Sequence, residues 1–354
     1  MNFETFFRNK TVMITGHTGF IGSWLSSVLL QNDSIVIGYS LDPPTTPNLF
    51  EILNLEGQMR SIKGNILDQR RLSQVLRKYQ PDIVFHLAAQ PIVLESYNNP
   101  VETFKTNVMG TVNLLENLRR EGSAKVVVVM TSDKVYRSIG WNCSYREVDP
   151  LGGKDPYSAS KSAQDIVVSS FRVSYFDNMG VSISSVRAGN VIGGGDWGVH
   201  RIVPDVVRGL REGSPLKIRN PDSVRPWQYV LEPISGMLKL AQRMWDDTDF
   251  SGEWNFGPNN NGEITVKELV DNFLKKWGGG SYSIAKDKEV RESNYLQLDI
   301  SKAKNALDWF PKYNFEKSIE ETVKWYKGYY EDKGNINNVT EKQIKAYFEG
   351  RNYE

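Results

Sequence analysis

The sequence predicts an α/β protein in which a doubly wound parallel sheet carries a smaller C-terminal α/β lobe. Three observations predict this fold. In the first 190 residues, short valine- and isoleucine-rich runs alternate with helix-like segments, which is typical of parallel strands covered on both faces. The first run leads through a glycine turn into a helix. After about residue 190 the chain becomes richer in Gly-, Pro- and Trp-containing loops, so we expect the second lobe there.

The expected elements alternate along the chain between strand and helix. The candidate strands cover residues 12–14, 35–37, 83–86, 126–130 and 181–186. The expected helices cover residues 20–31, 69–79, 100–120, 157–176, 204–212, 232–246, 265–277 and 315–331. We therefore predict a sheet domain over residues 1–190, to which segments near 228–258 return. The second lobe is expected to consist of residues 191–227 and 259–354.

The composition is that of an enzyme-sized chain without a dominant charge. Its 354 residues include 43 Lys and Arg against 42 Asp and Glu, so no net field attracts nucleic acid or a membrane surface. Cys143 is the single cysteine and there are three histidines, so neither an internal disulfide nor a metal site is expected. We recognise no signal peptide and no membrane-spanning apolar run, and we expect a cytoplasmic protein.

The glycine turn after the first strand is the strongest local motif. Gly16, Gly19 and Gly22 follow the apolar run 11–14 and open an apolar helix. The first glycine permits the sharp turn, the second lets the backbone approach a pyrophosphate, and the third lets the helix pack against the strand. The helix N-terminus then stabilises the phosphates through its free N–H groups and its dipole. This context favours a dinucleotide site over an ordinary strand–helix turn.

Tyr157 and Lys161 form a second motif. Three other tyrosine–lysine pairs have the same spacing, so the context decides. Asp155 and Pro156 provide an N-cap and a first-turn proline, which places Tyr157 and Lys161 one turn apart on one helix face. The helix follows the strand at 126–130, at the sheet edge where such folds bind ligands. An ammonium group near a phenol stabilises the phenolate, which can accept the proton of a substrate hydroxyl.

Three polar residues, Ser132, Asp133 and Lys134, follow the strand at 126–130. We expect Ser132 to hydrogen-bond the reacting hydroxyl, Asp133 to act as a general acid, and Lys134 to be a base or to hold a negative charge. The alternative for each residue alone is a capping turn. Three such residues near Tyr157 favour catalysis.

These motifs resemble the extended short-chain dehydrogenase/reductases that act on nucleotide sugars, a family with a Rossmann-type sheet. The resemblance rests on the glycine turn, the string at 86–90, Asn107, and the Tyr157/Lys161 pair. Longer strings resemble the CDP-glucose 4,6-dehydratase branch and lie at residues 16–20, 40–45, 149–153, 187–197, 218–221 and 225–228. The likeness covers nearly the whole chain, except for the tail beyond about residue 335.

The resemblance implies a redox-neutral reaction with NAD in deoxysugar biosynthesis. CDP-glucose would lose its 4-hydroxyl proton to Tyr157 and its C4 hydride to NAD, eliminate water across C5 and C6, and regain the hydride at C6. The implied cofactor-binding residues are Gly16, His17, Gly19, Phe20, Ile21, Gly22, Asp42, Asn65, Ile66, Leu87, Ala88, Ala89, Gln90, Asn107, Tyr157 and Lys161. The implied substrate-binding residues are Gln90, Ser132, Arg187, Asn190, Arg201, Arg225 and Arg291. A homodimer built from the helices near 100–120 and 157–176, or a homotetramer, is also implied.

The chain departs from the family pattern at three positions. Lys134 stands where the dTDP-glucose branch has the glutamate that removes the C5 proton, so either Lys134 is neutral or another group is the base. His17 stands where many relatives have glycine, and either contacts the pyrophosphate or is satisfied within its loop. Asn65 replaces an aspartate directed at adenine, and its amide still donates and accepts hydrogen bonds.

Two further choices stay open at this level. Asp42 lies near the position of a ribose-binding acid, although a role in the turn before Pro43 is equally consistent. No arginine lies there to bind the 2′-phosphate of NADP, and this absence favours NAD. Arginine suits a diphosphate, but surface ion pairing is the alternative for Arg291. Besides the 4,6-dehydratase, another nucleotide-sugar dehydratase, a nucleotide-sugar 4-epimerase and a non-catalytic NAD sensor remain possible, and the cluster at 132–134 argues against the epimerase.

Overall fold

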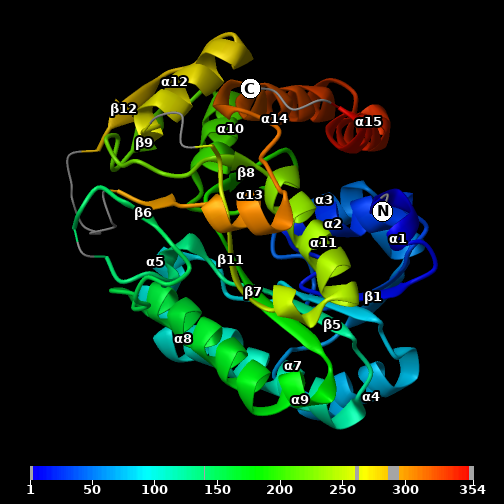
Figure 1. The fold of residues 1–354 in the computed structure, drawn as a ribbon. Coiled ribbons are helices and arrows are strands. Elements are labelled where there is room, and N and C mark those ends of the chain that lie inside the picture. The colour runs from blue at the N-terminus through cyan, green and yellow to red at the C-terminus, as the bar shows by residue number, and fades with distance from the viewer. Residues whose placement is uncertain (1–2, 139, 260–262, 286–294, 351–354) are drawn as a thin grey trace.

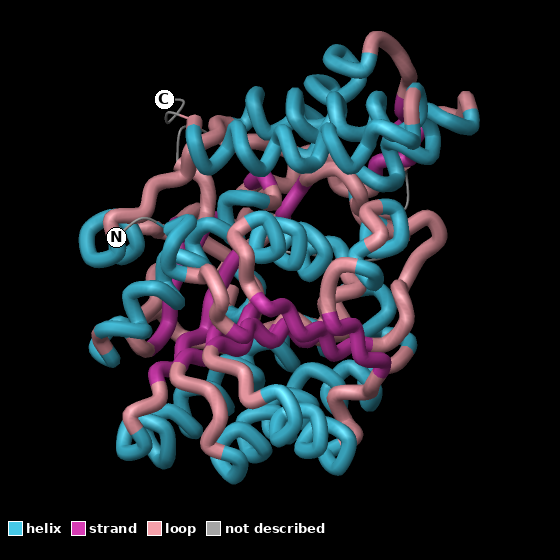
Figure 2. Tube along the Cα trace, turned by 90° about the vertical axis from the view of Figure 1, so that its right-hand side faces the viewer, coloured by secondary structure: helices cyan, strands magenta, loops and turns pink. Residues whose placement is uncertain are grey.

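A seven-stranded parallel sheet forms the centre of the computed structural model, which describes residues 3–138, 140–259, 263–285 and 295–350. Helices cover both faces of the sheet (Figures 1 and 2). The strand order is β11-β7-β5-β4-β1-β2-β3. The strands are β1 (Thr11–Thr15), β2 (Ile35–Ser40), β3 (Arg60–Lys63), β4 (Ile83–His86), β5 (Val126–Met130), β7 (Ser182–Ala188) and β11 (Gly252–Phe256). The chain runs outward from β1 to β3 and then returns to place β4 beside β1, which confirms the predicted doubly wound fold.

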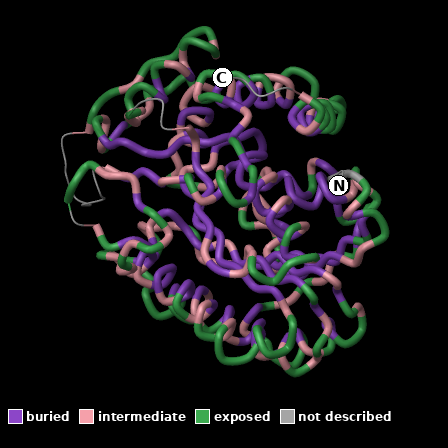
Figure 3. The backbone as a smooth tube through the Cα atoms, viewed as in Figure 1, coloured by how far each residue is buried: buried purple, intermediate pink, exposed green. Residues whose placement is uncertain are grey.

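Both faces of the sheet are buried because successive side chains along a strand enter different cores. In β5, Val126 and Val128 join one apolar cluster, and Val127 and Val129 join the other. The first cluster includes residues of α2 (Phe20–Gln31) and α11 (Leu231–Asp246). The second includes residues of α4 (Gln69–Tyr79), α7 (Gly110–Glu121) and α8 (Pro156–Phe171). Figure 3 shows the buried strands at the centre and the exposed segments around them.

The C-terminal lobe lies on the side of the sheet away from α4, α7 and α9 (Asp177–Met179) (Figure 1). Its helices are α10 (Ile202–Glu212), α12 (Val266–Trp277), α14 (Phe315–Glu331) and α15 (Ile336–Glu349), and α13 (Ser301–Leu307) packs against β11. Its short parallel strand pairs are β8 (Val191–Ile192) with β10 (Gln228–Tyr229), β9 (Leu216–Ile218) with β12 (Tyr282–Ile284), and β6 (Ser144–Tyr145) with β13 (Gln297–Leu298). The segment near 228–258 contributes both α11 and β11, so it adds a strand and a covering helix to the sheet.

Several elements have no counterpart among the expected ones, and β3 and α15 are two of them. Strand β3 contains one apolar residue, Ile62, at the edge of the sheet, and so has no strand-like pattern. Helix α15 lies in the tail. The remaining short helices are α1 (Phe3–Phe6), α3 (Leu49–Ile52), α5 (Val93–Asn98) and α6 (Pro100–Phe104). Within the described ranges, no helix is both long and apolar enough to cross a bilayer.

Candidate active site

A cavity of about 690 Å³ lies at the carboxyl edge of the sheet. One end is lined by the glycine turn after β1 and by the ends of β2 and β4. The other end is lined by residues that follow β5, by α8, and by loops of the C-terminal lobe. The cavity therefore lies at the ends of the neighbouring strands β1 and β4, where the strand order of the sheet reverses. Doubly wound sheets bind ligands at this place.

The backbone of the glycine turn packs closely against neighbouring backbone atoms, which leaves no room for side chains at two of its glycines. Gly16 has φ +79°, and a Cβ there would lie 2.7 Å from the backbone nitrogen of Ala88. A Cβ at Gly22 would lie 2.2 Å from the carbonyl oxygen of Gly16. Gly19 is the N-cap of α2, so the first free N–H groups of this helix face the turn. The turn can thus adopt this conformation only because Gly16 and Gly22 have no side chain, and the start of α2 is left suited to a phosphate.

His17 does not line the cavity, which corrects its assignment to the cofactor. Its ring is buried behind the turn, where Nε2 lies 2.8 Å from Ser61 Oγ and the ring packs at 5.2 Å on Phe50. The absence of a side chain at Gly38 makes room for it, because a Cβ there would lie 2.4 Å from the ring. Burial lowers the pKa of His17 to about 4, so the ring is neutral at pH 7. The ring is thus a buried group of the loop that does not face the cavity, and its Nδ1 has no hydrogen-bond partner among the described residues.

The other predicted dinucleotide residues divide into two groups. Those that line the cavity are Gly16, Gly19, Phe20, Ile21, Gly22, Asp42, Asn65, Ile66, Leu87, Ala88, Ala89, Tyr157 and Lys161. Asp42 forms an ion pair with Lys63, and both side chains are exposed. Asn65 Oδ1 accepts a hydrogen bond of 2.9 Å from Leu67 N, which leaves its amide nitrogen for a ligand.

Gln90 and Asn107 do not line the cavity, but they hold in place the loop that does. Asn107 lies in a π-helical turn, where Oδ1 accepts from Gln90 N at 2.8 Å and Nδ2 donates to Ser160 Oγ at 2.9 Å. Gln90 Nε2 donates to Thr103 Oγ1 at 2.8 Å. These bonds fix the loop after β4 against α8, so both residues support the cavity from behind its lining.

Helix α8 presents Tyr157 and Lys161 as the sequence predicts. Asp155 accepts a hydrogen bond of 2.9 Å from Ser158 N and caps the helix. The Tyr157 N–H donates to Ser96 Oγ at 3.1 Å, which holds the first turn. Burial raises the pKa of Tyr157 to about 12, and the charges of Asp133 and Asp155 add to this rise. A hydrogen bond with Ser132 and the charge of Arg201 oppose it. Ionisation of the phenol therefore depends on the neighbouring donor and cation.

Lys161 is held by a buried network that the sequence did not reveal. Its Nζ donates to Met130 O at 3.2 Å and to Gln164 Oε1 at 2.9 Å. Gln164 Nε2 in turn donates to Thr111 Oγ1 at 2.8 Å, and His86 Nε2 lies 2.9 Å from the same hydroxyl. Burial lowers the pKa of Lys161 to about 7. The spacing of Gln164, three residues after Lys161 on one helix face, was the available signal for this contact.

Asp133 is a buried carboxyl group with one oxygen uncommitted. Its Oδ1 accepts from Ser132 Oγ at 3.1 Å, and Oδ2 has no hydrogen-bond partner among the described residues. A Cβ at Gly189 would lie 1.9 Å from that oxygen, so only glycine leaves room for the carboxyl group. Lys134 lines the cavity beside Asp133, and its backbone N–H donates to Ser132 Oγ at 3.2 Å. The predicted polar cluster thus faces the cavity close to Tyr157.

Three predicted substrate residues, Asn190, Arg201 and Arg225, line the other end of the cavity. Asn190 has φ +41°, and its Oδ1 is buried without a partner among the described residues. Arg201 Nη1 donates to Asp196 Oδ2 at 2.9 Å. Arg225 donates through Nη1 to Val224 O at 2.9 Å. Two cations and an amide thus face the cavity at this end.

Arg187 does not reach this cavity, which differs from its predicted role in substrate binding. Its side chain is 2% exposed, and it makes two hydrogen bonds to Asp165, at 2.9 and 2.7 Å. It also donates to Tyr136 Oη at 3.0 Å. Thr131, directly before Ser132, donates to the same Asp165 carboxylate at 3.1 Å. Arg187 therefore joins β7, α8 and the end of β5 from behind. The last predicted substrate residue, Arg291, lies outside the described residues.

The arrangement suits proton and hydride chemistry on a hydroxyl-bearing ligand. A phenol, a hydroxyl group and a carboxyl group lie together between a phosphate-binding turn and two arginines. No cluster of three His, Cys, Asp or Glu side chains suited to a metal ion occurs within residues 3–138, 140–259, 263–285 and 295–350.

Comparison with known proteins gives relatives along most of the chain. Residues 13–322 match the family described as GDP-mannose 4,6 dehydratase. The chain is 46% identical to the CDP-glucose 4,6-dehydratase of Salmonella typhimurium strain LT2, over 92% of this chain and 93% of the relative. It is 30% identical to a dTDP-glucose 4,6-dehydratase of Xanthomonas campestris pv. campestris, over 89% of this chain and 93% of that one.

Solved structures share the fold. The dTDP-glucose 4,6-dehydratase of Streptomyces venezuelae with NAD and TYD bound has a TM-score of 0.79 and 25% identity, covering 93% of this chain and 99% of its own. The dTDP-glucose 4,6-dehydratase of Bacillus anthracis in complex with NAD has a TM-score of 0.77 and 25% identity, covering 92% and 99%.

Proposed function

This chain belongs to the GDP-mannose 4,6-dehydratase family, and on that premise we propose that it converts CDP-glucose to CDP-4-keto-6-deoxy-glucose and water. It is an NAD-dependent nucleotide-sugar 4,6-dehydratase. The observation that carries the choice of CDP-glucose is the identity of 46% with a CDP-glucose enzyme, against 30% with a dTDP-glucose enzyme of similar coverage. Tyr157, Ser132 and Asp133 at one end of the cavity support the two parts of this reaction.

The residues at the glycine turn fit NAD. A Cβ at Gly16 would collide with the backbone of Ala88, and one at Gly22 with the backbone of Gly16, so only glycines allow the turn that opens α2 toward the cavity. Asp42 lines the cavity where a ribose would lie. NAD bound there supplies the acceptor for the C4 hydride and the donor that returns it to C6. The turn, Asn65 and Lys161 hold the dinucleotide in this proposal.

Tyr157 removes the proton of the sugar 4-hydroxyl. Its phenol is buried at the cavity wall, where Ser132 hydrogen-bonds it and Arg201 contributes positive charge. Both influences favour the phenolate, which opposes the effect of burial. Ser132 also meets the substrate hydroxyl, and it thereby aligns the proton that Tyr157 takes.

Asp133 donates a proton to the C6 hydroxyl as water leaves. Its free Oδ2 is the buried carboxyl oxygen that can carry this proton. Lys134 has two assignments in this step: in neutral form it removes the C5 proton, or as a cation it stabilises the negative charge that forms when another group removes it. Lys134→Arg separates them, because the guanidinium group keeps the positive charge but cannot accept a proton. Solvent deuterium entry at C5 and turnover should both fall steeply only if Lys134 is the base.

The nucleotide is tested by comparing kcat/KM for CDP-glucose, dTDP-glucose and GDP-mannose, with the base-induced absorbance of the 4-keto-6-deoxy product as readout. We expect CDP-glucose to be preferred by at least about tenfold, since one good base-specific contact contributes about 1.4 kcal/mol. Equal or better turnover of dTDP-glucose would leave the dehydratase class standing but would overturn the choice of nucleotide.

We also propose a homodimer formed through α6, α8 and the π-helical turns that follow them. This face exposes apolar side chains, namely Val101, Phe104, Met109, Ile166 and Val173, with exposed fractions between 38% and 66%. Helices α6 and α8 pack side by side, so these residues can form one continuous patch that a second copy would cover. Ile166→Glu combined with Val173→Glu should give monomers in light scattering. A double variant that remains dimeric would contradict this interface. So would a wild-type tetramer whose dimers persist when this face carries the two substitutions. A cytoplasmic location remains a prediction.

A further inference from the structure

The loop at residues 193–201 ends at Arg201 and forms part of the cavity wall. We call it the 193–201 loop. It contains four glycines, so its own sequence leaves many conformations open to it. Trp24 of α2 donates to Gly194 O at 2.9 Å, and Arg208 of α10 donates to Trp197 O at 3.1 Å. Further contacts come from α14, a helix that does not line the cavity.

Aromatic side chains of α14 press against this loop. A Cβ at Gly194 would lie 2.0 Å from the ring of Trp325, so the loop backbone lies directly on that ring. Trp197, within the loop, packs edge-on against Trp325 at 5.7 Å, Tyr326 at 5.9 Å and Tyr329 at 5.1 Å. These contacts hold the middle of the loop against α14.

Tyr326 makes the polar contact that leads to the site. It is fully buried, and its hydroxyl donates to the backbone oxygen of Asp196. The Asp196 carboxylate accepts from Gly198 N at 2.9 Å and from Arg201 Nη1 at 2.9 Å. Arg201 lies close enough to Tyr157 for its charge to act on the phenol. One residue, Asp196, thus separates the Tyr326 hydroxyl from a cation at the reacting end of the cavity.

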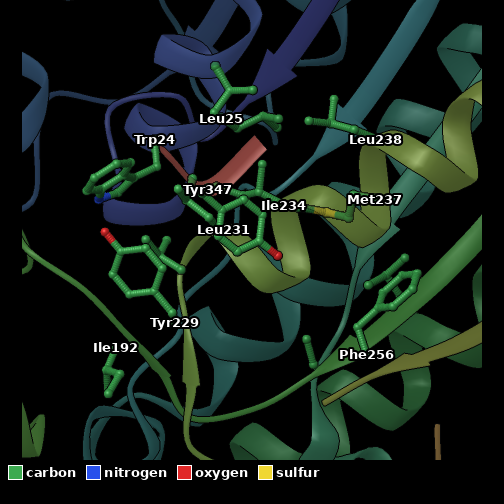
Figure 4. Close-up of a cluster of buried hydrophobic side chains, with 14 of the residues drawn as sticks. Trp24, Leu25, Ile192, Tyr229, Leu231, Ile234, Met237, Leu238, Phe256 and Tyr347 are labelled. Carbon is green, nitrogen blue, oxygen red and sulfur yellow. The ribbon is translucent and has the colours of Figure 1, made fainter. Parts of the chain in front are cut away.

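Helix α15 supports this arrangement from the outside. Trp325 Nε1 donates to Thr340 Oγ1 at 2.8 Å, and Gln343 Nε2 donates to Glu321 O at 2.8 Å. Tyr347 belongs to the buried cluster that Figure 4 shows, its ring packs at 5.1 Å on Tyr313, and its hydroxyl donates to Glu232 at 2.6 Å. The match to the family ends at residue 322, so Trp325, Tyr326 and all of α15 lie beyond it.

From these contacts we propose that Tyr326 is a positioning residue for nucleotide-sugar binding. It holds Asp196, and Asp196 holds Arg201 where the substrate and the phenol meet. Trp325, braced by Thr340, keeps the glycine-rich part of the loop from moving away. The inference goes beyond the proposed function, because it requires only that a nucleotide sugar binds in the cavity.

Tyr326→Phe removes the hydroxyl and leaves the ring contacts with Trp197. The Kd for CDP-glucose, measured by calorimetry, should rise about three- to tenfold, which is the range expected for one lost hydrogen bond. The Kd for NAD should stay within twofold. The control is Tyr347→Phe, which also removes one buried phenol hydroxyl but contacts neither the loop nor Trp325. It should lower Tm and leave both Kd values unchanged.

A double-mutant cycle tests the route through Arg201. Arg201→Gln weakens binding by itself, and adding Tyr326→Phe should then change Kd by less than twofold. Thr340→Val, which keeps the side-chain shape, should raise Kd in the same direction and serves if Tyr326→Phe does not fold. Full additivity with Arg201→Gln, or a Tyr326→Phe variant that loses stability with an unchanged Kd, would overturn the inference. Because the cycle is run with dTDP-glucose in parallel, a wrong choice of nucleotide alters the turnover assay but not this result.

Discussion

Gly189 sets the position of the proposed general acid, and Gly189→Ala tests this directly. The added Cβ would lie 1.9 Å from Asp133 Oδ2, whereas an ordinary contact begins at 3.4 Å. The carboxyl group must therefore move by about 1.5 Å or rotate away. Because a displacement of about 1 Å in a reacting group can cost about 10²-fold in rate, we expect kcat to fall by roughly that factor.

The loss should fall on one step of the reaction. Asp133 acts in the elimination of water and not in the oxidation at C4, so the 4-ketoglucose nucleotide should accumulate in Gly189→Ala and be detected by chemical quench and mass spectrometry. Asp133→Asn should accumulate the same species, and the double variant should be little slower than either single one.

The matched control is Gly257→Ala, directly after β11. A Cβ there meets its nearest neighbour, Leu298, at an ordinary 3.4 Å, so kcat should be unchanged. A Gly189→Ala enzyme whose kcat stays within twofold of the wild type would refute the argument that Asp133 must occupy its observed position. So would a loss of activity without accumulation of the 4-keto species.

Three further predictions follow from the burial of individual groups. Tyr157→Phe should lower kcat by about 10²–10⁴-fold, because a general base is lost, while NAD affinity by fluorescence titration stays the same; near-normal turnover would contradict the assignment. Arg187→Met should lower the free energy of unfolding in urea by about 3–5 kcal/mol, because it leaves Asp165 charged and unpaired; lost substrate affinity at unchanged stability would instead favour the role predicted from sequence. Burial lowers the pKa of His17 to about 4 and that of His86 to about 3, so the unfolded chain binds more protons below pH 6.5, and stability should decrease as the pH falls from 6.5 to 4. His17→Gln should flatten this decrease by up to about 3 kcal/mol in denaturant titrations, and an unchanged slope would show that His17 is not buried in neutral form.

The features that the sequence predicted well are local ones. The glycine turn, the cap at Asp155 and the spacing of Tyr157 and Lys161 each depend on neighbours within about one helical turn, so the pattern determines the geometry. The strands β1, β2, β4, β5 and β7 were recognisable because both of their faces are buried in apolar clusters, whereas β3 and β11, at the two edges of the sheet, were not among the predicted strands.

The features that sequence reasoning missed depend on partners distant in the chain. Arg187 suits a diphosphate by its chemistry, but Asp165 of α8 satisfies it, and this pairing follows from the packing of α8 on β7. The direction of the His17 ring depends on the space above Gly38. The contacts of α15 lie on α11 and α14, so the sequence of the tail by itself gave no indication of them.

The path of the hydride tests the central claim most directly. With CDP-glucose deuterated at C4, the proposed reaction moves the label to C6 of the same sugar, because Tyr157 and the group at 132–134 act on one substrate in one cavity. We predict a product with deuterium in its C6 methyl group, and with a proton at C5 that exchanges with solvent. Deuterium retained at C4, in a product that still has its C6 hydroxyl group, would contradict the dehydratase account and would identify the chain as an epimerase.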